Sequence, residues 1–98
     1  MEILTLDLIK QNLRVDDYSR DPQKQREIDK TLTEYANRAE REVYRELNKR
    51  YADIIREYGE IPSEIIQAAL YYLGKDWSGS LKFELPIVFK QLLNPYKQ

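Results

Sequence analysis

Acidic side chains are the residues of this sequence whose type and spacing come nearest to a catalytic pattern. Glu40, Glu42 and Glu46 lie within two turns of a predicted helix. Paired carboxylates can act as general acid and base, but only in a concave site that perturbs their pKa values. Four arginines surround them in the sequence: Arg38, Arg41, Arg45 and Arg50. We therefore expect ordinary ionised surface acids here, and no catalytic pair.

The composition excludes many other kinds of site. The chain has no His and no Cys, which leaves no thiol nucleophile, Ser-His-Asp triad, His/Cys zinc site or disulfide. Asp16 and Asp17 lack the alternating acids, the Gly and the final Glu of a calcium loop. Gly59, Gly74 and Gly79 are isolated, so no glycine-rich loop can hold a phosphate. We expect no enzymatic activity, no metal and no cofactor.

The length and the charge of the chain limit which other functions are possible. The 98 residues suit a single domain over 1–98, and 16 Lys plus Arg against 17 Asp plus Glu give a net charge of −1. A protein that coats nucleic acid would be strongly basic. The start of the chain is acidic and has no cleavable apolar segment. The longest apolar stretch, 65–73, is far shorter than the roughly 20 residues of a membrane span. We expect an intracellular protein without a membrane anchor.

One apolar stripe predicts the longest helix. Its start is marked by Asp21 as a cap and Pro22 at the first helical position, and Asn48 is a plausible end or kink. The helix spans about 24 residues, with charged residues on its other faces. The stripe consists of Ile28, Leu32, Tyr35, Ala39, Val43 and Leu47.

Shorter helices are predicted on either side of the long one. Thr5 can cap a helix over 6–13. Further helices are expected over 51–58, 62–77 and 86–93, and residues 78–84 form a loop with a short extended piece. The last helix has an apolar run of anchors: Ile87, Val88, Phe89, Leu92 and Leu93. The fold class is therefore all-α, a single small domain of about four helices with one long central helix.

Aromatic residues are the main candidates for an interface. Tyr and Trp suit protein interfaces that are partly exposed to water, but they also pack into cores and stack on nucleic-acid bases. We rank intramolecular core first, a protein interface second and nucleic acid third. Segment 65–73 is apolar almost all round, so it either is sandwiched by the other helices or faces another subunit. The candidate subunit-interface residues are Tyr44, Tyr51, Tyr71, Tyr72, Trp77, Leu81 and Phe83.

The order of helix anchors and caps along the whole chain resembles the small head–tail connector proteins of tailed phages, also known as DNA-packaging or head-completion proteins. The resemblance includes the start at Leu4–Asp7, Gly59–Pro62 and the close at Leu92–Tyr96. Segment 76–80 departs from the family, which has an aromatic-Asn-Arg-Glu segment and a longer loop here, so ring contacts are expected to differ. The positions that match the family pattern as core or cap are Thr5, Leu6, Leu13, Ala39, Val43, Leu47, Pro62, Ala69, Leu73, Pro86, Leu92 and Leu93.

The resemblance implies a structural, non-enzymatic part of a phage or prophage. Such proteins form a homo-oligomeric ring, commonly dodecameric, beneath the portal protein. The ring continues the DNA channel, with DNA only as non-specific cargo, and it offers a docking surface to the next tail-proximal connector protein. Its location would be the host cytoplasm during assembly and the head–tail junction of the virion.

The alternative is a small helical DNA-binding or packaging-regulatory module. It requires a basic face, for which the candidate cations near the C-terminus are Lys75, Lys82, Lys90 and Lys97.

Overall fold

The computed structural model describes residues 1–13, 21–79 and 86–97, and these segments are all-helical, without a strand. This confirms the all-α class. The helix over 51–58 stands apart from the long helix, so the described segments hold five α-helices instead of four. Of the loop predicted over 78–84, residues 80–84 lie outside the described residues. The elements are α1 (Leu6–Leu13), α2 (Pro22–Leu47), α3 (Tyr51–Tyr58), α4 (Ser63–Trp77), α5 (Ile87–Leu93) and a 3₁₀ turn, η1 (Asn94–Tyr96).

Local capping explains where the helices begin and end. At the start of α2, Asp21 Oδ1 accepts a hydrogen bond from Gln23 N at 3.0 Å, while Thr5 Oγ1 accepts from Leu8 N at 3.2 Å at the start of α1. Asn48 ends α2 in the left-handed conformation, at φ 53° and ψ 41°. Asn adopts this conformation more readily than most other residues. The chain can therefore turn sharply into α3.

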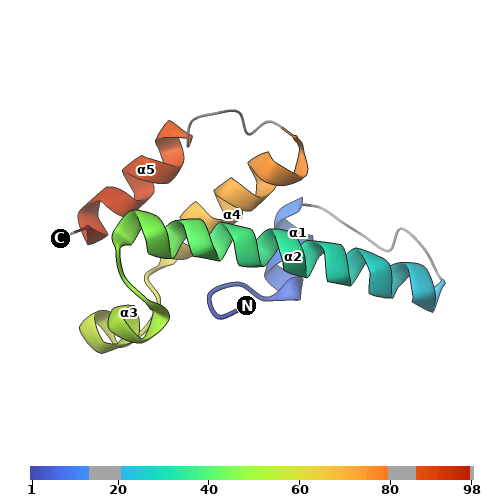
Figure 1. Cartoon of the computed structure of the whole chain (residues 1–98), viewed down its shortest axis with the longest axis horizontal. Helices are drawn as coiled ribbons and strands as arrows, with labels where there is room; N and C mark the ends of the chain where they lie inside the picture. The colour runs from blue at the N-terminus through green and yellow to red at the C-terminus, as the bar shows by residue number, and fades with distance from the viewer. Residues whose placement is uncertain (14–20, 80–85, 98) are drawn as a thin grey trace.

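The helices pack as two layers with α2 in front of α4 and α1 (Figure 1). Helix α4 contacts α1, α2 and α5, and α5 contacts α2, α4 and η1. Fully buried alanines on α2 and α4 allow a close approach of the two backbones. The core comprises Ile3, Leu4, Ile9, Leu32, Ala36, Ala39, Val43, Leu47, Ile54, Ile65, Ala68, Ala69, Leu73, Phe89 and Leu93.

Two layers of helices make the molecule flat, with extents of 46 × 30 × 17 Å. The first part of α2, residues 22–31, contains no buried residue and projects beyond the other helices (Figure 1). A salt bridge of 2.7 Å between Lys10 Nζ and Asp29 Oδ1 ties α1 to this part. The projecting end therefore presents mostly polar and charged side chains to solvent.

Helix α4 has one side in the core and another side that is partly open. Ile65, Ala68, Ala69 and Leu73 are fully buried, whereas the neighbouring positions 66 and 70–72 are only half-buried. The other helices thus do not sandwich it on every side. Within the described segments, no helix is long and apolar enough to cross a membrane.

Candidate functional site

Glu40 is not the exposed acid that the sequence predicts. It is 4% exposed, and it is the buried charged residue of the described core. The prediction was wrong because Glu40 lies on the side of α2 that faces the N-terminal segment. Glu42 and Glu46 are nearer to the expectation: each is partly exposed and forms a salt bridge, with Arg45 and Lys97 respectively.

The Glu40 carboxylate binds the main chain of residues 2–4, which we call the N-terminal strap. Its Oε1 accepts hydrogen bonds from Glu2 N at 2.8 Å and Ile3 N at 3.1 Å, and its Oε2 accepts from Leu4 N at 3.0 Å. Ile3 and Leu4 are both buried. Because both carboxylate oxygens are engaged and covered, this site holds the backbone of the strap and offers no free base to a substrate.

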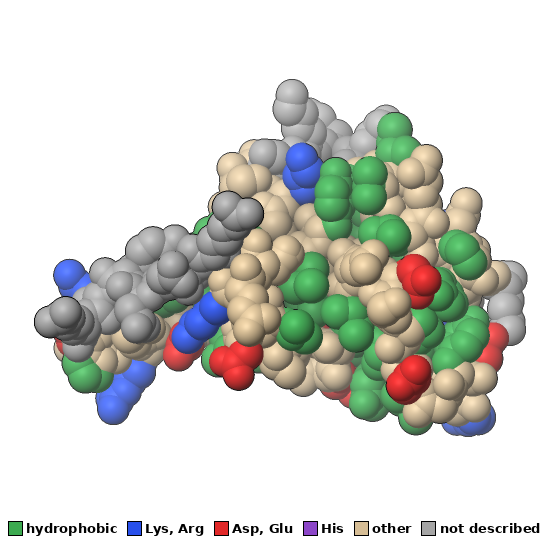
Figure 2. All heavy atoms as spheres, turned by 180° about the vertical axis from the view of Figure 1, so that it is seen from behind, with side chains coloured by type: hydrophobic (Ala, Val, Ile, Leu, Met, Phe, Trp, Pro, Cys, Tyr) green, Lys and Arg blue, Asp and Glu red, His purple; other side chains and the backbone are tan. Residues whose placement is uncertain are grey.

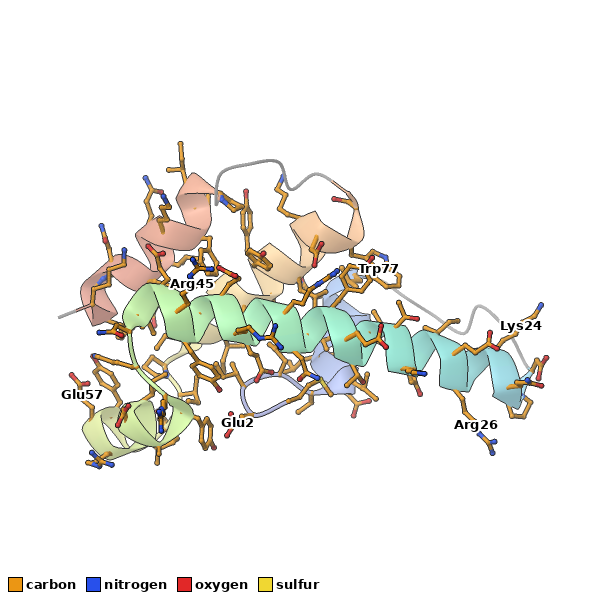
Figure 3. The ribbon with its side chains drawn as sticks, in the orientation of Figure 1. Glu2, Lys24, Arg26, Arg45, Glu57 and Trp77 are labelled. Carbon is orange, nitrogen blue, oxygen red and sulfur yellow. The ribbon has the colours of Figure 1, made fainter. Side chains whose placement is uncertain are left out.

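Tyr44 supports the strap from the next turn of α2. Its hydroxyl donates to Glu2 Oε1 at 3.3 Å (Figure 3). Burial raises the pKa of Tyr44 because it disfavours the charged phenolate, and the negative charges of Glu40 and Glu2 raise it further. This predicted interface residue therefore makes an intramolecular contact. Tyr51, another of the predicted set, is partly buried against the core.

Trp77 lies at the end of α4 beside the middle of α2 (Figure 3). It is 36% exposed, and its ring meets the Tyr35 ring edge-on, with centroids 5.2 Å apart. The Arg38 guanidinium lies 4.4 Å from the centroid of the Tyr35 ring and forms a 2.8 Å salt bridge with Asp76. A groove of about 330 Å³ runs from Trp77 along α2. Its other lining residues are Lys24, Glu27, Ile28 and Thr31.

The two tyrosines of α4 have different surroundings. Tyr72 packs on the buried Phe89, with ring centroids 5.4 Å apart, and burial raises its pKa. Tyr71 is also partly buried, with Lys75 Nζ 5.5 Å from its ring centroid. It lines an open groove of about 360 Å³ between α1, α4 and α5, which we call the α4–α5 groove. Its lining among the described residues is Asn12, Gln67, Leu70, Tyr71, Val88 and Leu92.

The face behind α2 carries many apolar side chains and few charged ones over α4 and α5 (Figure 2). None of the described residues that line the α4–α5 groove is charged. Val88, which lines the groove, is 42% exposed, and its neighbour Ile87 is 73% exposed. The expectation that these two residues anchor α5 was wrong, since only Phe89 and Leu93 of that helix are buried.

The positions that carry the family resemblance lie where packing or capping needs them. Thr5 caps α1, and Pro62 and Pro86 immediately precede α4 and α5. The remaining interface candidates, Leu81 and Phe83, lie outside the described residues. The other positions are buried or partly buried in the core: Leu6, Leu13, Ala39, Val43, Leu47, Ala69, Leu73, Leu92 and Leu93.

Three of the four basic residues predicted as candidates near the C-terminus lie in the described segments, and Lys90 is an exposed residue of α5. Lys97 pairs with Glu46, and Lys75 lies beside Tyr71. Asp16, Asp17 and Lys82 lie outside the described residues. Over the described segments, no group of three residues is arranged to bind a metal ion.

Lys49 and Tyr96 fix the C-terminal turn to the rest of the molecule. Lys49 Nζ donates to Glu57 Oε2 and to the Tyr96 carbonyl oxygen, both at 2.8 Å. The Tyr96 hydroxyl donates to Glu64 Oε2 at 2.6 Å. That hydrogen bond raises the pKa of Tyr96 to about 12 and lowers the pKa of Glu64 below its ordinary value. The two groups therefore couple η1 to the start of α4.

Tyr96→Phe is expected to raise the pKa of Glu64 toward its ordinary value, because the variant loses the hydrogen bond that favours the carboxylate. The stability that this bond contributes is present above the ordinary pKa of Glu64. It is lost as the pH falls through the lowered pKa of the folded state. An NMR titration of the Glu64 carboxyl carbon measures the shift.

Ser63→Ala is the control for that titration, because Ser63 Oγ also donates to Glu64 Oε2, but at 3.3 Å. We expect a smaller change in the pKa of Glu64 from Ser63→Ala than from Tyr96→Phe. Equal changes would show that the Tyr96 hydroxyl is not the main influence on Glu64.

Comparison with known proteins adds no relative: the chain matches no protein-family model, no curated protein and no solved structure.

Proposed function

We propose that this protein is a head–tail connector adaptor of a tailed phage or prophage. It assembles as a ring beneath the portal protein, continues the DNA channel and receives the next tail-proximal protein. The sequence resemblance supplies this function. The observation that supports it best is the partly open side of α4, which lies beside exposed apolar residues of α5.

Association with other protein copies suits this surface. A helix that is apolar nearly all round is normally buried on every side, yet in the described segments one side of α4 is only partly covered. The net charge of −1 lets many copies come together with little mutual repulsion. DNA that passes through a channel requires no base readout, so a connector needs no recognition helix.

The charge distribution favours the connector over the alternative DNA-binding module. Binding to duplex DNA relies on several Lys and Arg side chains that neutralise phosphates together. In the described segments, Lys97 is paired with Glu46 and Lys49 with Glu57, and the apolar face carries few cations. These pairs leave less positive charge available for phosphates.

The test is binding to a purified portal ring from the same genome, with duplex DNA measured in parallel. The connector proposal expects saturable binding to the portal and a ring of density on the portal by electron microscopy. It also expects DNA binding that is weak. Failure to bind the portal, together with DNA binding that falls steeply with salt concentration, would support the alternative module instead.

A further inference from the structure

Ile87 is the most exposed large apolar residue of the described segments, at 73%. It lies in the first turn of α5, with the half-exposed Val88 beside it. Scattered single apolar residues are normal on a surface. Ile87 differs because a groove of matching chemistry, whose described lining is uncharged, lies on the same chain.

The α4–α5 groove fits an aliphatic side chain. Its volume of about 360 Å³ is far larger than the roughly 30 Å³ that a water molecule occupies in the liquid. Leu70, Val88 and Leu92 supply aliphatic walls, and Tyr71 supplies an aromatic one. Asn12 and Gln67 are its polar residues, and neither is charged. Such a lining favours an apolar group over a phosphate or a charged peptide.

We propose that Ile87 of one copy inserts into the α4–α5 groove of a second copy of this chain. The inference deepens the proposed function and rests on it, since it names the contact between neighbouring subunits of the ring.

The exposed area of the molecule supports a second copy as the occupant. A stable interface of standard size buries about 800 Å² on each partner. The broad face of this flat molecule measures 46 × 30 Å. That face is therefore large enough for a specific contact between copies.

The directions of Ile87 and the groove favour a ring. Successive residues of an α-helix point about 100° apart, so Ile87 points away from the side of α5 on which Val88 and Leu92 line the groove. A contact between two different surfaces of the same protein is heterologous. When a heterologous contact is repeated by rotation and the last copy meets the first, the copies form a ring.

The experiment compares the molar mass of the wild-type chain and three variants by light scattering, up to the solubility limit. Ile87→Asp charges the inserted residue, and Val88→Asp charges the groove. We expect each to weaken self-association at least tenfold. Leu8→Asp is the matched control: Leu8 is an exposed apolar residue, at 37%, and does not line the groove. It is expected to associate like the wild type.

Mixing the two groove-contact variants tests the heterologous geometry. An Ile87→Asp chain keeps its groove and a Val88→Asp chain keeps its Ile87, so an equimolar mixture forms one intact contact and stops at a pair. The chain has no Cys, which permits a second test by oxidation. An Ile87→Cys chain should form a mixed disulfide with a Gln67→Cys chain much faster than with a Leu8→Cys chain.

The proposal is overturned if Ile87→Asp associates like the wild type, or if the wild type stays monomeric at every concentration. These outcomes are separate from the fate of the proposed function. If the protein binds the portal and the Ile87→Asp variant still forms a ring, the proposed contact is wrong and the connector function stands. If self-association depends on Ile87 but the protein does not bind the portal, the contact stands and the connector function is wrong.

Discussion

Glu40→Ala is expected to lower the free energy of unfolding by about 2–4 kcal/mol, because buried donors that lose their acceptor cost roughly 1–3 kcal/mol each. Three backbone amides of the N-terminal strap donate to this one carboxylate. The loss of stability stays below the sum of the three separate costs, because the strap can detach and its amides can then bind water. Detachment also exposes Ile3 and Leu4, which adds the cost of their lost burial.

Urea unfolding of wild type and variant measures this loss, and amide hydrogen exchange locates it. We expect exchange to accelerate at Ile3 and Leu4 well before the global transition. Glu42→Ala is the matched control, two residues away on the same helix with a partly exposed side chain and a 3.8 Å salt bridge. It should change stability by less than about 1 kcal/mol. Equal losses for the two variants would contradict the role assigned to Glu40.

Phe89→Ala is expected to cost about 3–5 kcal/mol, the usual range for removing a fully buried aromatic ring from a core. Phe89 is fully buried in α5 and packs against Tyr72 of α4. Because α5 is a short helix of 7 residues, packing contributes most of its stability. Loss of this ring should therefore loosen α5 and η1 together.

Gln91→Ala is the control for this variant, because it shortens an exposed side chain of the same helix. Its stability in urea should lie within about 0.5 kcal/mol of the wild type. A loss from Phe89→Ala below about 1 kcal/mol would mean that α5 is not anchored by Phe89.

Helix positions were predictable because their signals are local. The stripe from Ile28 to Leu47, the Asp21-Pro22 start and the Asn48 end together define α2, and the structure has that helix. The apolar run 87–89 misled the interpretation of α5. Three consecutive residues point about 100° apart on a helix, so they cannot all reach one core.

The burial of Glu40 was much harder to predict, although one signal was present. Glu40 continues the spacing of Ala36, Val43 and Leu47, all of which are buried on α2. A charge within a buried stripe indicates a partner. That partner, however, is main chain some 36–38 residues away. Backbone amides carry no side-chain signature, so the sequence pattern could not identify them.

The interface residues divided according to tertiary packing. Tyr44 and Tyr72 are of a residue type that is common at interfaces, but they make intramolecular contacts with Glu2 and Phe89. Tyr71 and Trp77 instead line grooves at the surface. Amphipathic aromatic residues suit both environments, and only the arrangement of α4 against α2 and α5 decides between them.

The molar mass of the wild-type chain over a wide concentration range, measured by light scattering coupled to size exclusion, tests the central claim most directly. The claim is that open apolar surface on α4 and α5 joins copies of this chain into a ring. It predicts a mass that rises with concentration to one discrete, large species with a central opening in electron micrographs. A single monomeric mass at all concentrations would contradict it.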